Sequence, residues 1–385
     1  MNNPTVLLIG PQPFYEERGT PISLRLVVTG LTELGYDVDF LTFPIGQNVT
    51  IVGVNTIRIK NLLGFTSIPI GFSFRKIFLD LFLFSKARKL LKSKNYVRVH
   101  ASEEAVFAPL MFLRHARNRI VYDMASSLPE QLETLPVFRL GLTQKFLTRL
   151  ERYALQNVGY VFCSWGLLDH VRKIAPDTRA SAWVFPSHRA SVVDEAIQNL
   201  RDELRIIDDA FPIVYTGSFA SYQGLDVVVE SIPEIVARIP SAVVILVGGN
   251  NDEVTKLKRA IAPEHQDNIR VLPKQSRDRI PVFFALAAVL LSSRSHGKNV
   301  PLKVFEYLAA ERPIVASDVP AHRDILGTGR AALYEPNPAS LARAVHLVYS
   351  NPDNSAQMVE TATKYRSEHL SWESYLEALK LAYPQ

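Results

Sequence analysis

The stretch PLKVFEYLAAERPIVASD, residues 301–318, contains a helix followed by a strand. Pro301 belongs to the residue type that opens helices at their first position. The apolar residues after it recur at the spacing of one helical face: Leu302, Phe305, Leu308 and Ala309. A short apolar run at 314–316 has the composition of a buried strand, and another at 289–291 precedes the helix. The stretch therefore predicts a strand–helix–strand unit with two parallel strands.

The same alternation of strand-like and helix-like segments runs through both halves of the chain. In the second half the expected strands are residues 213–216, 243–247, 269–272, 289–291, 314–316 and 331–334. In the first half they are residues 6–9, 38–42, 56–59, 97–100, 120–122, 160–163 and 183–185. Thr20 as a cap and Pro21 at the first helical position start the helix that follows the first strand. Such alternation predicts an α/β fold with two doubly wound parallel sheets.

Between the two halves, residues 186–210 are polar and charged and contain no strand pattern. We therefore expect an N-terminal domain over residues 1–188, an interdomain connection over 189–210 and a C-terminal domain over 211–370. Residues 371–385 form a further helix, and the sequence leaves its docking side open. Two domains of this kind imply a ligand in the cleft between them, at the carboxyl ends of the strands.

The composition is that of a folded chain, because 47% of its 385 residues are hydrophobic and 21% are charged. A single cysteine, Cys163, excludes an internal disulfide and a cysteine-rich metal site, and it favours a reducing compartment. The start, MNNPTVLLIG, lacks the basic residues and the long apolar run of a secretory signal. No apolar run approaches the length of a spanning helix. We therefore expect a cytoplasmic protein that is soluble or peripheral on the inner face of the membrane.

Charge is divided unevenly along the chain. Residues 1–190 contain 23 Lys and Arg against 14 Asp and Glu, a net charge of +9, and the remainder carries −4 of the total of +5. The densest basic stretch runs from Arg75 to Arg98 and includes an apolar stripe with three phenylalanines. This pattern fits a helix on an anionic membrane surface, and it fits equally an ordinary packed helix with a solvated basic face. Nucleic acid is not expected as a partner, since no binding motif accompanies the charge.

Signatures of several enzyme classes are absent. The first strand ends in GPQP in place of G-x-G-x-x-G, and no G-x-x-x-x-G-K-[ST], H-E-x-x-H or G-x-S-x-G occurs. The sequence therefore gives no motif evidence for four enzyme classes: dinucleotide dehydrogenases, P-loop enzymes, zinc proteases and α/β-hydrolases. Asp37 and Asp39 have the D-x-D spacing that can hold a divalent cation on a diphosphate. Because this pair spans the entry of an apolar strand, we expect solvated carboxylates there and no metal site.

Lys303 and Glu306 lie three residues apart, on one face of the helix that follows Pro301. They could form a plain helical ion pair. A cation in the first helical turn, however, opposes the helix dipole at a cost of about 0.3–1 kcal/mol. An anion such as a diphosphate at the amino terminus of the helix would offset that cost and would contact both Lys303 and the helix amides.

Five blocks of the chain together resemble the glycosyltransferase family 4 group, whose GT-B architecture has two Rossmann-like domains facing a cleft. The blocks are GPQPFYEERGTPISLRLVVTGLTELGYDV (10–38), VHASEEA (99–105), YDMASSLPEQL (122–132), YTGSFASYQGLDVVVES (215–231) and PLKVFEYLAAERPIVASDVPAHRDIL (301–326). They span nearly the whole chain, and the last two are quite specific as a pair. The resemblance implies a retaining, nucleotide-sugar-dependent glycosyltransferase that needs no metal and no further cofactor.

For the donor, the resemblance implies that the second domain binds the nucleotide sugar. Glu306, the second acid of the family's E-x7-E pattern, would accept hydrogen bonds from the ribose hydroxyls. Lys303 would be a catalytic cation on the diphosphate. The other residues that would contact the diphosphate in this domain are Gly217, Ser218, Lys298, Asn299 and Val300. The base would be recognised near residues 272–275, largely by backbone groups.

On the first domain, the resemblance implies that Gly19 and Thr20 close over the diphosphate and the sugar. Asp123 and Ser127, in YDMASSLPEQL, would serve the sugar and acceptor side, with Asp123 as a catalytic group. His100 is a further acceptor-side candidate. A lone histidine at a strand end is more often structural, and we favour that interpretation of His100.

The chain departs from the family pattern in the donor site. Lys298 stands where the first acid of E-x7-E is expected. The loop GSFASYQG (217–224) lacks the arginine and lysine that the family commonly has there, and Gln223 stands at the lysine position. The charge of the diphosphate would then be met by Lys298, Lys303 and Arg294.

The expected reaction moves a hexose from a nucleoside diphosphate sugar to an acceptor hydroxyl, lipid-linked or on a growing surface glycan. Basic groups and helix amides would stabilise the charge that develops on the leaving diphosphate, and domain closure would exclude water. Two alternatives stay open. One is a GT-B-like binding or partner subunit without activity, which Lys298 and the missing loop cations favour. The other is a nucleotide-sugar epimerase, which would need no acceptor.

Overall fold

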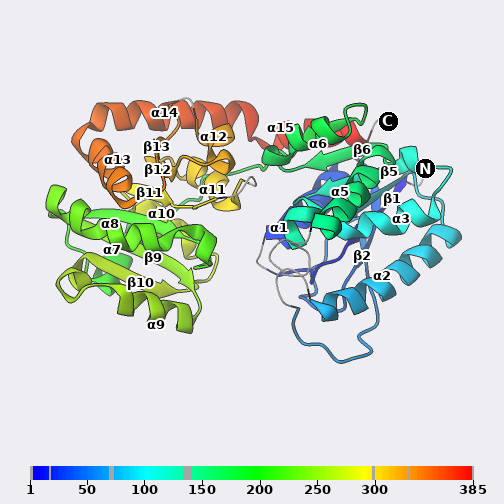
Figure 1. The fold of residues 1–385 in the computed structure, drawn as a ribbon, viewed down its shortest axis with the longest axis horizontal. Coiled ribbons are helices and arrows are strands. Elements are labelled where there is room, and N and C mark those ends of the chain that lie inside the picture. The colour runs from blue at the N-terminus through cyan, green and yellow to red at the C-terminus, as the bar shows by residue number, and fades with distance from the viewer. Residues whose placement is uncertain are drawn as a thin grey trace. The chain divides into compact units, whose positions relative to one another are not determined.

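The chain folds into two compact units (Figure 1). The computed structural model describes residues 3–16, 19–68, 73–132, 141–296, 300–327 and 329–383. Unit 1 contains Met1–Val184 and Glu373–Gln385, and unit 2 contains Phe185–Trp372. The first unit thus ends four residues before the expected domain end at 188, and the expected connection, 189–210, belongs to unit 2.

Unit 1 is built on a seven-stranded parallel sheet in the order β3-β2-β1-β4-β5-β6-β7. Its strands are β1 Thr5–Gly10, β2 Asp37–Thr42, β3 Val54–Arg58, β4 Arg98–Ser102, β5 Ile120–Met124, β6 Tyr160–Cys163 and β7 Ala180–Ala182. The helices described in it are α1 Gly19–Glu33, α2 Phe74–Ser93, α3 Phe107–Phe112, α4 Leu128–Leu132, α5 Gly141–Gln156, α6 Leu168–Ile174 and α15 Trp372–Ala382. The strand order reverses between β1 and β4, so the sheet is doubly wound as the alternation predicts.

The two faces of this sheet pack against different helices. On one face, a hydrophobic core joins alternate strand residues to the inner sides of α2, α3, α5 and α6. Helix α15 packs against α1, because a Cβ atom placed on Gly30 of α1 would lie 2.9 Å from side-chain atoms of both Tyr375 and Leu379. The final helix, whose docking side the sequence leaves open, therefore belongs to unit 1.

The prediction of a strand at residues 183–185 is wrong. The last strand of unit 1 is β7, which pairs with β6 through the partners of Val161, Phe162 and Cys163. Beyond it, Trp183 adds one more backbone hydrogen bond, of 2.7 Å, to the carbonyl oxygen of Cys163. The sequence Ala-Ser-Ala of β7 lacks β-branched and aromatic residues, so pairing with β6 decides its conformation and local propensity does not.

Unit 2 is built on a six-stranded parallel sheet in the order β10-β9-β8-β11-β12-β13. Its strands are β8 Phe211–Thr216, β9 Ala242–Gly249, β10 Ile269–Pro273, β11 Val289–Ser292, β12 Ile314–Ser317 and β13 Ala332–Tyr334. The helices described in it are α7 Asp194–Leu204, α8 Leu225–Arg238, α9 Asn251–Ala260, α10 Ile280–Leu286, α11 Leu302–Ala310, α12 Pro320–Leu326, α13 Pro338–Ser350 and α14 Pro352–His369. Strand β11, helix α11 and strand β12 form the predicted strand–helix–strand unit.

Helix α11 begins at Leu302, and Pro301 occupies the cap position just before it. The helix buries an apolar face that includes Phe305 and Leu308, as the spacing predicts. Because the strands are parallel, their carboxyl ends meet at one edge of the sheet, and the first turn of α11 lies after such an end. In doubly wound folds, ligands bind at this edge of the sheet.

Candidate functional site

The backbone comes unusually close together at the carboxyl ends of β8 and β9. Gly217 follows β8 with a φ of 138°, and its N–H donates to the carbonyl oxygen of Val247 at 2.9 Å. A Cβ atom on Gly248 would lie 2.2 Å from the carbonyl oxygen of Gly217, so only glycine fits at position 248. Ser218 is exposed, and its carbonyl oxygen accepts a hydrogen bond of 2.7 Å from the hydroxyl of Tyr215.

Lys303 is a buried cation at the second position of α11, with 8% of its surface exposed. Its Nζ lies 3.8 Å from the centre of the Tyr215 ring and donates to Oε1 of Gln223 at 3.3 Å. No carboxylate of the described residues lies within ion-pair distance of Nζ. A buried charge without a counter-charge is unfavourable, so this position calls for an anion.

Arg294 adds a second cation to the same edge of the sheet. It lies in the loop after β11, and its guanidinium carbon is 5.2 Å from the centre of the Tyr222 ring. Burial lowers the pKa of Arg294. Burial, and then repulsion from Arg294, hold the pKa of Lys303 well below its ordinary value. Both shifts arise mainly because burial disfavours the charged form of each side chain, and a bound anion would act against them.

Glu306, one turn along α11, is not paired with Lys303. Its carboxylate accepts from the guanidinium of Arg277 at 3.0 Å. Burial raises the pKa of Glu306, and Arg277 offsets part of that rise. The plain helical ion pair is therefore wrong, because each member has a partner from another element: Gln223 for Lys303 and Arg277 for Glu306.

Of the other predicted donor residues, Val300 is partly buried and lies two residues before α11. Lys298 and Asn299 lie outside the described residues. One residue of this region that the sequence did not single out is Tyr307, whose hydroxyl accepts from the N–H of Thr216 at 2.9 Å and donates to the carbonyl of Leu291 at 3.3 Å. It ties α11 to the ends of β8 and β11. Nothing in the apolar pattern of the helix distinguishes this tyrosine from a core residue.

In unit 1, Asp123 and His100 lie together inside the protein. Nε2 of His100 is 3.4 Å from Oδ2 of Asp123, and its Nδ1 is 2.6 Å from the hydroxyl of Tyr383 in the C-terminal segment. The exposed fractions are 1% for Asp123 and 0% for His100. This position of His100, between β5 and the C-terminal segment, suits the structural role. Oδ1 of Asp123 has no hydrogen-bond partner among the described residues.

Ser127 is buried in the turn between β5 and α4. The next residue, Leu128, donates its N–H to Oε2 of Glu151 at 2.6 Å, and Oε1 of Glu151 lies 2.7 Å from Nε2 of His170. A buried carboxylate therefore fixes this turn. Gly19 and Thr20 are the first two residues of α1, which starts one residue before the expected cap.

Glu103 is a buried acid for which the sequence suggests no role. It follows β4 with a φ of 52°, in the left-handed region, and its side chain is 6% exposed. Ser126 donates to its carboxylate at 3.3 Å. Burial, together with repulsion from Glu104, raises the pKa of Glu103 to about 8. A strained backbone and a perturbed acid at a strand end mark a candidate functional residue, and no sequence signal reveals a left-handed glutamate.

The D-x-D pair is not a pair of solvated carboxylates. Asp39 is 6% exposed and accepts hydrogen bonds from Asn55, Lys94 and Tyr96 at 2.9–3.0 Å. Burial acts to raise the pKa of Asp39, and these hydrogen bonds lower it below the ordinary value. In the part of the chain that the structure describes, no group of three or more His, Cys, Asp or Glu side chains could hold a metal ion. Within the same residues, no helix has the length and apolar composition to cross a membrane.

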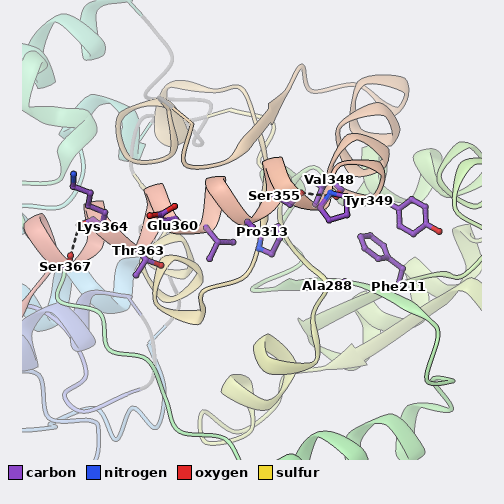
Figure 2. Close-up of a pocket in the computed structure, with 13 residues that line it drawn as sticks. Phe211, Ala288, Pro313, Val348, Tyr349, Ser355, Glu360, Thr363, Lys364 and Ser367 are labelled. Atoms are coloured by element: carbon purple, nitrogen blue, oxygen red, sulfur yellow. Dashed lines mark hydrogen bonds between the residues drawn. The ribbon is translucent and has the colours of Figure 1, made fainter.

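A separate groove of about 910 Å³ runs along α14 in unit 2 (Figure 2). Its lining is mainly apolar and includes Phe211 and Tyr349. Phe211 is the first residue of β8, while Ala288 and Pro313 directly precede β11 and β12. The groove therefore lies at the amino ends of the strands, at the edge opposite to the one that carries Lys303, and it is distinct from the candidate donor site.

Comparison with known proteins points to one kind of domain. Residues 196–365 match the family model described as "Glycosyl transferases group 1". This range lies within unit 2 and includes Lys303 and Glu306. The "Putative glycosyltransferase YtcC" of Bacillus subtilis (strain 168) is 24% identical over 169 residues, which span 41% of this chain and 41% of that relative.

Solved structures share the fold over the whole chain. Sucrose-phosphate synthase from Thermosynechococcus elongatus is 16% identical, with a TM-score of 0.76 over 99% of this chain and 98% of its own. A glycosyltransferase from Rickettsia africae is 14% identical, with a TM-score of 0.75 over 100% of both chains. Anabaena Alr3699/HepE, in complex with UDP-glucose, is 14% identical with a TM-score of 0.72, over 99% of this chain and 100% of its own. Residues 196–365 therefore match a glycosyltransferase group 1 domain, in a chain that has the GT-B fold.

Proposed function

We propose that the chain is a retaining glycosyltransferase that moves a hexose from a nucleoside diphosphate sugar to an acceptor hydroxyl. The observation that carries the proposal is Lys303, a buried cation without a counter-charge among the described residues. It stands in the first turn of α11, inside a glycosyltransferase group 1 domain. A diphosphate there would bind the ammonium and the helix amides together. The UDP-glucose bound by Anabaena HepE supports a nucleotide sugar as the ligand.

Each donor group has a role that follows from its chemistry. The ammonium of Lys303, with Arg294 and Lys298, neutralises the diphosphate. The backbone at Gly217, Ser218, Asn299 and Val300 approaches the phosphate oxygens. Glu306 accepts hydrogen bonds from the ribose hydroxyls, which then replace or share its contact with Arg277. A carboxylate suits a vicinal diol because both of its oxygens accept.

The reaction needs charge stabilisation at the leaving group. When the bond between the sugar and the diphosphate breaks, negative charge develops on the diphosphate oxygen, and Lys303 with the amides of α11 stabilises it. We propose that these cations meet this need without a metal ion and without any further cofactor. The acceptor hydroxyl attacks on the face that the diphosphate leaves, so configuration is retained. We assign the acceptor and sugar side to unit 1, where Asp123 lies near the end of β5 and Ser127 in the turn that follows it, with Gly19 and Thr20 at α1.

Turnover of the donor tests this function. The protein is incubated with UDP-, GDP-, ADP- and dTDP-glucose in the presence of a chelator, and proton NMR follows release of the diphosphate and the anomer first formed. Slow transfer to water or to an added acceptor, with retention, is expected for one donor. Conversion of the sugar nucleotide itself, with no acceptor, would identify an epimerase. Binding without any turnover would identify an inactive partner subunit.

The acceptor class is proposed from helix α2. Its inner side chains Leu79, Leu83 and Ala87 are buried in the core of unit 1. On its outer side Phe74, Ile77 and Leu81 are 84%, 41% and 64% exposed. The exposed basic residues of the helix are Arg75, Arg88, Lys89 and Lys92. An exposed apolar and basic face of this kind fits an anionic membrane surface, and hence an acceptor that is lipid-linked or part of a growing surface glycan.

Liposome sedimentation tests the membrane surface. Wild-type protein is expected to bind vesicles with anionic headgroups at low salt and to leave zwitterionic vesicles unbound. The variant Leu81→Ser should weaken binding several-fold, because it removes an exposed apolar side chain of the proposed face. The control is Leu347→Ser, a leucine of unit 2 that is 49% exposed. Equal binding of both variants and wild type would remove α2 from the proposal.

A further inference from the structure

His322 is a fully buried residue of α12, with 0% of its surface exposed. Its Nδ1 lies 2.8 Å from the carbonyl oxygen of Ser317, and its Nε2 lies 2.9 Å from Oγ of Ser292. A carbonyl oxygen only accepts, so Nδ1 carries the hydrogen. Nε2 is then an acceptor, and the hydroxyl of Ser292 donates to it. These two contacts fix the tautomer of the neutral imidazole.

The two serines that His322 contacts are the last residues of β11 and β12. These strands end at the edge that carries the candidate donor site. Oγ of Ser317 lies 3.2 Å from Nδ1 of His322 and also donates to the carbonyl oxygen of Arg294. One histidine therefore joins both strand ends to the loop that bears the second cation of the site.

The same loop is tied to the turn that holds Lys303. Oγ of Ser293 donates to the carbonyl oxygen of Gln223 at 2.7 Å. The side chain of Gln223 in turn accepts from Nζ of Lys303 at 3.3 Å. Hydrogen bonds thus run from His322 through Ser317 to Arg294, and from the neighbouring Ser293 through Gln223 to Lys303.

Electrostatics keep His322 in the state that these bonds require. Burial lowers the pKa of His322 to about 4, and the nearby Lys303 and Arg294 lower it as well, against the bond to Ser317. A protonated ring could not accept from Ser292, and it would repel both cations.

We propose that His322 is a positioning residue of the diphosphate site, which fixes the loop of Arg294 through Ser292 and Ser317 without touching the ligand. This inference rests on the proposed function, since it concerns the same site. His322 therefore contributes to binding of the diphosphate group of the donor and does not contribute to binding of its nucleoside.

The test compares a nucleoside diphosphate with its parent nucleoside. Calorimetric titration of wild type with UDP, GDP, ADP and dTDP first identifies the diphosphate that binds. His322→Leu and Ser317→Ala are then titrated with that diphosphate and with its nucleoside. We expect each variant to weaken diphosphate binding by about tenfold while the affinity for the nucleoside stays the same.

Two further variants separate positioning from a structural role. Ser231→Ala is the matched control, because Ser231 is also fully buried in unit 2 and donates to a backbone carbonyl, that of Val228. It should leave both affinities unchanged. In His322→Leu with Ser292→Ala, the orphaned hydroxyl is gone, so the melting temperature should recover while the diphosphate-specific loss remains.

The outcomes distinguish a failure of the proposed function from a failure of the role of His322. A wild-type chain that binds none of these diphosphates overturns the proposed function and this role with it. Normal binding by wild type, together with an unchanged ratio of diphosphate to nucleoside affinity in Ser317→Ala and His322→Leu, overturns the role of His322 alone. Recovery of both stability and affinity in the double variant would also overturn it.

Discussion

The burial of Lys303 lowers the stability of the folded protein. Its ammonium is buried, its pKa is lowered first by burial and then by Arg294, and its contacts are the amide of Gln223 and the ring of Tyr215. A neutral amide and an aromatic face compensate a buried charge only in part. Selection for stability alone would favour an apolar side chain at this position. A buried lysine there is expected where function requires the charge at the expense of stability.

Replacing this cation should therefore stabilise the ligand-free protein. We expect Lys303→Met to raise the free energy of unfolding by on the order of 1 kcal/mol, because it removes an uncompensated buried charge and keeps the length of the side chain. Thermal denaturation without ligand measures the change, with Lys256→Met, at an exposed lysine of α9, as the control. A destabilised Lys303→Met would show that the lysine is a structural residue.

Because of Glu103, the stability of unit 1 is expected to fall as pH rises. The pKa of Glu103 is raised from 4.5 to about 8, so the folded state keeps a proton that the unfolded chain releases. The stabilisation from this proton is complete below pH 4.5 and is lost as pH rises towards 8. Asp80, whose pKa burial and Glu104 also raise to about 8, contributes with the same sign.

The variant Glu103→Gln cannot ionise and should remove part of this dependence. Relative to wild type, its stability should increase between pH 5 and pH 8 by up to about 1.4 kcal/mol per pH unit. Urea denaturation across this range measures the difference, with Glu230→Gln, an exposed carboxylate of α8, as the control. A constant difference between Glu103→Gln and wild type would show that Glu103 is ionised in the folded protein.

Among the elements, the turn before α8 depends on a single glycine. Gly224 has a φ of 66°, and a Cβ atom there would lie 2.0 Å from the carbonyl oxygen of Ser293. The turn of residues 221–224 and the loop after β11 are in contact at this point. Ser295 also donates its N–H to the carbonyl of Tyr222 at 2.9 Å.

Gly224→Ala should separate the turn from this loop. We expect a loss of about 3 kcal/mol or more in the free energy of unfolding, from the left-handed backbone and the clash together. Gly329→Ala is the matched control, because Gly329 has a φ of 77° but open space around it, and it should cost about 1 kcal/mol. Urea denaturation compares the two. Equal losses would mean that the loop moves away freely.

The elements also show what the sequence could predict. Periodicity and turn residues located α11 and the strands around it, because apolar spacing is a local property that burial preserves. They failed at β7, where pairing imposes a strand on Ala-Ser-Ala, and at Glu103, whose left-handed backbone has no sequence signal. They also failed for the partners of Lys303, since Gln223 and Tyr215 are brought to it by tertiary structure.

At the scale of the whole molecule, the chain leaves unit 1, builds unit 2 and then returns to unit 1 from Glu373 onward. The returning segment is fixed in the core, where the hydroxyl of Tyr383 bonds to Nδ1 of His100 and its carbonyl accepts from the hydroxyl of Tyr36. The alternation of strand-like and helix-like segments predicted two domains, but nothing in residues 371–385 could show which of them this helix joins. That depends on a complementary surface on α1.

Tyr383→Phe should therefore weaken unit 1 alone. It leaves a ring nitrogen of the buried His100 without its hydrogen bond, at an expected cost of about 1–3 kcal/mol. Hydrogen exchange should become faster in β4 and β5, with no change in the strands of unit 2. Tyr349→Phe, at a tyrosine that is 43% exposed, is the control. Faster exchange in both units would show that they unfold as one.

We propose that unit 2 binds the diphosphate of a nucleotide sugar at Lys303. The most direct measurement is calorimetric titration of wild type and Lys303→Met with UDP, GDP, ADP and dTDP in the presence of a chelator. We expect one diphosphate to bind wild type selectively, and Lys303→Met to bind it between about 10- and 100-fold more weakly, the value of a hydrogen bond to a charged group. Equal binding by the two proteins, or no binding by a folded wild type, would contradict the claim.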